Sequence, residues 1–96
     1  MNELEFNIRL YLTDVMRSWT YRIGSTSQRY VLSAMTELFD SLSDDDIELI
    51  RLRYMECLTL NEVARRCYLN ERTIRNHTNP TVKQVKEIIK KATEQA

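Results

Sequence analysis

Residues 58–77, LTLNEVARRCYLNERTIRNH, decide how this chain folds. Thr59 is followed three residues later by Glu62, a pair that predicts a capped helix start. The residues that recur at helical spacing after it would form one narrow apolar face: Val63, Ala64 and Cys67. A short amphipathic helix is therefore predicted, and its end is expected just before residue 70.

A second short helix is predicted from about Glu71 to His77, with Asn70 as its N-cap and Ile74 as its core residue. The remaining positions are polar or basic, and the side chains expected to face solvent are Arg72, Arg75 and Asn76. Arginine and asparagine are well suited to hydrogen-bond base edges and phosphates. Two capped helices joined by a tight turn predict a helix-turn-helix unit, whose second helix would enter the major groove of DNA.

The sequence before this stretch is helical as well. Apolar residues recur every three or four positions from Leu4 to Ile23, which predicts one helix whose stripe includes Trp19 as a core residue. Residues 24–27 (GSTS) break this pattern, and a second helix is predicted from about Ser27 to Leu42. The two helices would form a helical hairpin.

Two further helices complete the prediction. Ser43 would cap a helix that begins with three aspartates, Asp44 to Asp46, and ends near Glu56. Pro80 is expected to interrupt the chain and start a last helix to about Thr93, with Asn79 as its cap. The predicted fold is all-α: an N-terminal amphipathic hairpin (residues 1–41), for packing or dimerisation, followed by a four-helix helix-turn-helix domain (residues 42–96).

Composition narrows the class of protein. The 96 residues contain one glycine and one proline, which favours helices over a turn-rich β fold. No apolar run approaches the ~20 residues that span a bilayer, and the acidic N-terminus lacks a signal-peptide pattern. Cys57 and Cys67 match no metal spacing and are expected to be buried thiols in a reducing cytosol. A cytoplasmic protein without a cofactor is expected.

The charges are distributed unevenly although the chain is neutral overall. Residues 1–50 hold four arginines and nine acidic residues, a net charge of −5, whereas residues 51–96 hold ten basic and five acidic residues, a net charge of +5. This asymmetry favours a polyanionic partner for the second half. The alternative interpretation is that these charged helix faces are only solvated and bind no polyanion.

From Leu42 to about Ile89 the chain resembles the C-terminal, region-four domain of bacterial sigma factors. The resemblance rests on RLRY (51–54), LTLNEVA (58–64) and LNERTIR (69–75). The segment ERTIRNH (71–77) is also similar to the recognition helix of LuxR-type response regulators. In architecture the chain is similar to small phage and prophage regulators of the ArpU and RinA type, which join a helical extension to a sigma-like half.

This resemblance implies a sequence-specific, double-stranded DNA-binding transcription regulator, phage or bacterial, with a recognition helix over about 70–78. The residues it implies for DNA contact are Thr59, Asn70, Glu71, Arg72, Thr73, Arg75, Asn76, His77 and Lys83. It also implies that Leu69 lies in the core. Tyr68 departs from the family at a turn position usually held by glycine, where it must either adopt a positive φ or force a different turn.

Two alternatives to this interpretation remain open, and a third class of protein, an enzyme, is not expected. A sigma-like module without DNA binding would act by contacting RNA polymerase or a sigma factor. The N-terminal stripe either packs on the rest of the chain or pairs with a second copy, which would make a homodimer spanning two half-sites. An enzyme is not expected, because the only histidine, His77, has no nucleophile or acid spaced to form a catalytic set with it.

Overall fold

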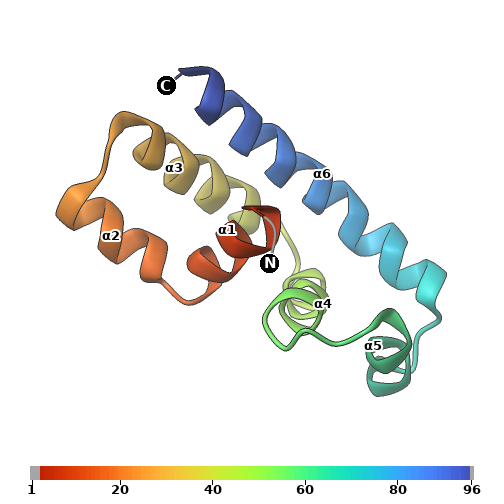
Figure 1. Ribbon diagram of the computed structural model, residues 1–96. Helices are drawn as coiled ribbons and strands as arrows, with labels where there is room; N and C mark the ends of the chain where they lie inside the picture. Colours follow the sequence, from red (N-terminus) through yellow and green to blue (C-terminus); the bar gives the residue numbers. More distant parts are fainter. Residues whose placement is uncertain (1–2, 96) are drawn as a thin grey trace.

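The protein is described here from a computed structural model, which covers residues 3–95 without the side chains of residues 21–23 and 95. This part of the chain is all-α, as the sequence predicts (Figure 1). Its helices are α1 (Glu3–Leu12), α2 (Val15–Ile23), α3 (Thr26–Asp40), α4 (Asp44–Tyr54), α5 (Leu60–Cys67) and α6 (Glu71–Gln95). The molecule measures 41 × 25 × 22 Å along its principal axes.

The prediction of a single helix from Leu4 to Ile23 is wrong, because the chain turns between α1 and α2. The Thr13 hydroxyl donates to the Arg9 carbonyl at 2.7 Å, and Asp14 adopts a left-handed φ of 61°. Aspartate tolerates this conformation better than most residues. The turn lets α2 bury Met16, while Trp19, expected in the core, remains 46% exposed.

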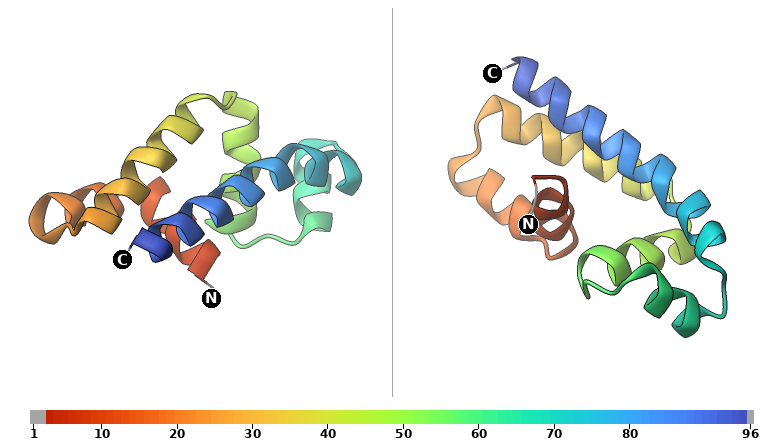
Figure 2. Two further views of the ribbon diagram at one scale, coloured as in Figure 1. Left: turned by 90° about the horizontal axis from the view of Figure 1, so that it is seen from above. Right: turned by 45° about the vertical axis from the view of Figure 1, so that its right-hand side comes forward.

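Helices α3 and α6 lie side by side and run in opposite directions (Figures 1 and 2). The Ser27 hydroxyl, at the start of α3, donates to the Ala92 carbonyl near the end of α6 at 3.4 Å. A hydrophobic cluster fills the space between these helices, α1, α2 and α4: Ile8, Met16, Met35, Leu38, Phe39, Ile50 and Val85. The rings of Tyr11 and Phe39 stack against it with centroids 4.9 Å apart.

A second hydrophobic cluster joins α4, α5 and the start of α6. It contains Leu49, Leu52, Val63 and Ile74, with Ala64 and Cys67 packed against it. Helix α4 contributes to both clusters, since Ile50 belongs to the first and its neighbours to the second. The first cluster thus crosses the boundary predicted between residues 41 and 42, and α5 and α6 are supported through α4.

The predicted interruption at Pro80 is wrong: α6 continues through this proline for 25 residues, so a separate last helix capped by Asn79 does not form. Proline leaves the carbonyl of Asn76 without its usual helical donor. Asn76 and Pro80 are exposed, so water can reach that carbonyl. The neighbouring positions Thr78, Thr81 and Val82 are buried, and their packing holds the helix together on both sides of Pro80.

The predicted starts of α4 and α5 are confirmed. Ser43 accepts a hydrogen bond from the Asp46 amide, and Thr59 and Glu62 form the reciprocal capping box. The expectation of two buried thiols is wrong for Cys57, which is exposed in the α4–α5 connection with φ of 55°. Cys67, on the inner side of α5, is half-buried. Among the described helices, none has the length and apolar character needed to cross a membrane.

Candidate nucleic-acid interface

A tight turn over residues 68–70 joins α5 to α6 (Figure 1). Tyr68 ends α5 in a left-handed conformation, with φ 56° and ψ 38°. The amides of Tyr68 and Leu69 both donate to the Ala64 carbonyl, which closes the end of the helix. Of the two outcomes expected at Tyr68, a positive φ or a different turn, the chain therefore adopts the positive φ.

The two residues of this turn that precede Asn70 face solvent. Tyr68 is 94% exposed, so its ring packs against nothing in the described part of the chain. Leu69 is 40% exposed, which corrects the expectation that it belongs to the core. The turn is thus held by backbone hydrogen bonds and by the burial of Val63 and Ile74 on either side of it.

Asn70 caps α6 as predicted, since its Oδ1 accepts a hydrogen bond from the Thr73 amide at 2.8 Å. The cap begins the helix one residue after the turn and directs the first side chains of α6 outward. Thr73 itself is half-buried and lines a hollow between α4, the end of α5 and α6, with Leu49 and Cys67. Thr73 therefore lies on a different side of α6 from Arg72.

The basic and amide side chains at the start of α6 are exposed. Arg72 and Asn76 make no side-chain hydrogen bond or ion pair with any described residue, and both extend from the face opposite Ile74. Arg75 is 3.9 Å from the Glu71 carboxylate, a loose pair between side chains that are about half exposed. Such a pair contributes little to stability, so the guanidinium remains available to a ligand.

His77 is bound to α4. Its Nδ1 lies 2.9 Å from Oδ1 of Asp46, and the imidazole remains 52% exposed. The Asp46 carboxylate, at the start of α4, thus contacts α6 across 31 residues of sequence. This contact holds the imidazole beside the exposed first turns of α6 and leaves its Nε2 available to another partner.

Two residues predicted to contact DNA lie away from the start of α6. Thr59 is at the opposite end of α5 from the turn, about 12 Å along the helix, and its hydroxyl is engaged with Glu62. Lys83 is exposed on α6 but follows Pro80, about three turns after the helix begins. Arg65 and Arg66 on α5 are also exposed, although they are not among the residues predicted to contact DNA. Two adjacent arginines just before the turn are the sequence signal for them.

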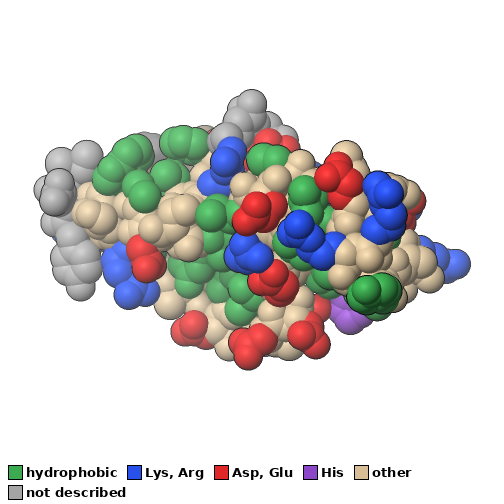
Figure 3. All heavy atoms as spheres, turned by 90° about the horizontal axis from the view of Figure 1, so that it is seen from below, with side chains coloured by type: hydrophobic (Ala, Val, Ile, Leu, Met, Phe, Trp, Pro, Cys, Tyr) green, Lys and Arg blue, Asp and Glu red, His purple; other side chains and the backbone are tan. Residues whose placement is uncertain are grey.

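On α4, before the turn, one group of opposite charges is paired. Arg51 donates to Glu48 at 2.6 and 2.9 Å and to Glu56 at 3.0 Å. Its hydrogen bonds hold the pKa of Glu48 below the ordinary value of 4.5, and in turn they raise the pKa of Arg51. The face of the molecule seen from below shows acidic and basic side chains interleaved (Figure 3). No single sign of charge dominates that face.

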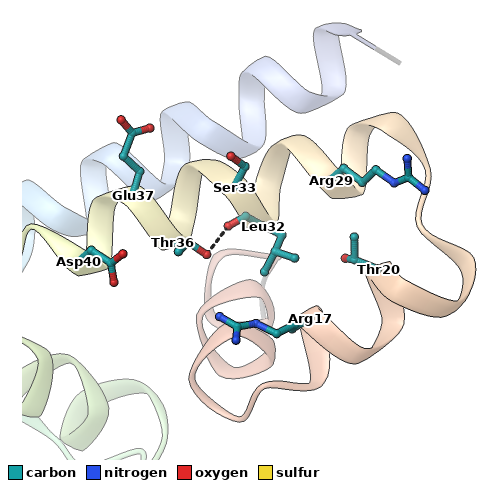
Figure 4. A pocket seen from close by; sticks show the side chains of 8 residues that line it. All are labelled: Arg17, Thr20, Arg29, Leu32, Ser33, Thr36, Glu37 and Asp40. Atoms are coloured by element: carbon teal, nitrogen blue, oxygen red, sulfur yellow. Dashed lines mark hydrogen bonds between the residues drawn. The ribbon is translucent and has the colours of Figure 1, made fainter.

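A shallow hollow of about 680 Å³ lies elsewhere, between α2 and α3 (Figure 4). Arg17 and Arg29 border it, and their guanidinium groups point away from each other. The hydroxyls of Thr20 and Thr36 are occupied, because each donates to a carbonyl of its own helix at 2.8 Å. Ser33, Glu37 and Asp40 of α3 also line it.

The described residues thus combine a capped helix, a tight turn and a second capped helix whose first turns present two arginines and an asparagine to solvent. The chain was compared with models of known protein families, with curated proteins and with solved structures, and none of these matches it.

Proposed function

We propose that the protein is a sequence-specific transcription regulator that binds double-stranded DNA, with α5 and the first turns of α6 acting as a helix-turn-helix. The observation that carries the proposal is the exposure of Arg72 and Asn76 without a partner in the described chain. Arginine pairs with guanine and asparagine with adenine through two hydrogen bonds each in the major groove.

The packing of α6 against α4 also favours DNA binding. A helix that reads bases must be held rigidly while its outer face stays free. Ile74 and Thr78 are fully buried on the inner face, and Arg53 of α4 donates to the Thr78 hydroxyl at 2.8 Å. Asp46 fixes His77 in addition, so α4 holds α6 at two positions within the first two turns.

The test is selection of bound duplexes from a random pool, followed by anisotropy titrations on the selected sequence. Arg72→Ala and Arg75→Ala should each weaken binding by about 1–3 kcal/mol if the residue reads a base, and should relax the preference at one position. Arg17→Ala is the matched control, because Arg17 is exposed on α2 and borders the separate hollow. Absence of binding to any duplex at low salt would end the proposal.

The same selection shows how many protein chains bind each duplex. A palindromic consensus with half-sites ~34 Å apart would support a homodimer, whereas a single asymmetric site would support one chain per duplex. Sedimentation of the free protein tells whether a dimer through the N-terminal helices exists before DNA is added.

A second candidate function is a protein-interaction module that binds RNA polymerase or a sigma factor without reading DNA. Phe6 and Trp19 favour it, because each is 46% exposed and both border an apolar hollow formed by α1, α2 and α3. Exposed aromatic residues beside an apolar hollow are typical of protein contacts. Recovery of polymerase from nuclease-treated bacterial lysate, lost in Trp19→Ala and retained in Arg72→Ala, would support this function over DNA binding.

A further inference from the structure

Helix α6 carries most of its positive charge along one side. The cationic stripe consists of Arg72, Arg75, Lys83, Lys86 and Lys90, all of which are exposed. With about 3.6 residues per turn, these positions fall within about 80° of arc around the helix. None of the three lysines takes part in the ion pairs between described residues. The basic character of the start of α6 therefore continues along the second half of the helix.

The contacts of α6 with its neighbours separate this stripe from the other side of the helix. Lys86 and Lys90 border a hollow toward the start of α1, together with Glu3 and Glu94. Lys91 borders a different hollow toward α3, where Glu37 and Glu87 lie. Lys91 is thus an exposed lysine of the same helix that lies outside the stripe.

The length of the stripe determines what it can contact. Arg72 and Lys90 are separated by 18 residues of one continuous helix, which corresponds to about 27 Å. The major groove of B-DNA is only about 12 Å wide. If α6 inserts its first turns at an angle across the groove, the rest of this straight helix extends past the groove edge, and its later turns then pass close to the phosphates that border the groove.

We infer that Lys83, Lys86 and Lys90 bind the phosphate backbone of the same duplex whose bases contact the first turns of α6. The inference rests on the proposed function and extends it, because the bound DNA would then follow α6 well beyond the α5–α6 unit. The continuity of α6 through Pro80 makes this possible, since a break there would separate the lysines from the arginines (Figures 1 and 2).

The experiment is a series of anisotropy titrations on the selected duplex and on a random duplex between 50 and 200 mM salt. Each lysine that neutralises a phosphate contributes about one unit to the slope of log affinity against log salt. Lys86→Ala and Lys90→Ala should each lower that slope by about one unit and the double variant by about two. Both duplexes should weaken by the same factor, since phosphate contacts do not distinguish sequences.

Two control variants make the result specific. Lys91→Ala removes the same charge from a position about 100° around the helix from Lys90, outside the stripe, and should leave the slope unchanged. Lys86→Arg and Lys90→Arg keep the charge and should retain the slope. All these side chains are exposed, so thermal unfolding of each variant should match that of the unsubstituted protein.

The outcomes separate this inference from the proposed function. If the unsubstituted protein binds and the double variant keeps its slope, the inference is wrong and the function stands. An equal loss of slope in Lys91→Ala would also overturn it, because the effect would then follow from net charge alone. If the unsubstituted protein binds no duplex at low salt, the proposed function fails and the inference fails with it.

Discussion

Replacement of Tyr68 by glycine should stabilise the protein, although it removes the largest side chain of the turn. Tyr68 has φ 56° and is 94% exposed, so the substitution loses no packing and relieves a clash of its Cβ with the backbone. A non-glycine residue in this conformation costs about 1–2 kcal/mol. Glycine restores about 0.5–1 kcal/mol of conformational entropy to the unfolded chain, which offsets part of the gain.

The expected net effect of Tyr68→Gly is an increase of about 0.5–1 kcal/mol in the free energy of unfolding. For a domain of this size, such a change raises Tm by roughly 3–6 °C. Urea titration and thermal unfolding followed by circular dichroism measure it. Tyr68→Ala is the matched control, because alanine keeps the Cβ and should gain nothing. A glycine variant less stable than the alanine variant would refute the left-handed end of α5.

Two further predictions concern α6 and α4. Pro80→Ala should restore the hydrogen bond to the Asn76 carbonyl and stabilise the protein by roughly 1–2 kcal/mol. Proline inside a helix costs about 3 kcal/mol, and it returns part of this by stiffening the unfolded chain. A lower free energy of unfolding for this variant in urea titration would contradict the expectation. Because Arg51 lowers the pKa of Glu48 in the folded state, the stability that Glu48 contributes is present above its ordinary pKa of 4.5 and is lost as the pH falls through the lowered value. Glu48→Gln should therefore flatten the acid side of a stability–pH profile relative to the unsubstituted protein, and an unchanged profile would contradict the pair.

The local patterns that predicted the structure well are those with a short-range physical cause. The capping residues Ser43, Thr59 and Asn70 each bind the amide three residues later, as their spacing predicts. Val63 and Ile74, chosen from helical periodicity, are both fully buried. The exposure of Arg72, Arg75 and Asn76 follows from the same periodicity, because the opposite side of the helix carries the core residues.

The errors arose where tertiary packing overrides a local preference. Pro80 disfavours a helix interior, but the buried neighbours Thr78 and Thr81 hold α6 together around it. The apolar periodicity also predicted one helix where the structure has α1 and α2, because the left-handed turn at Asp14 leaves the spacing of apolar residues unchanged. The contact between Asp46 and His77 joins residues 31 positions apart, and no pattern in the sequence connects them.

The most direct test of DNA binding is to map amide shifts of the ¹⁵N-labelled protein as a short random-sequence duplex is added at low salt. If the start of α6 binds the groove, the amides that shift or broaden should lie within residues 65–90, with the largest effects near Arg72 and Asn76. A spectrum that does not change, or changes confined to α1 and α2, would contradict the proposed interface.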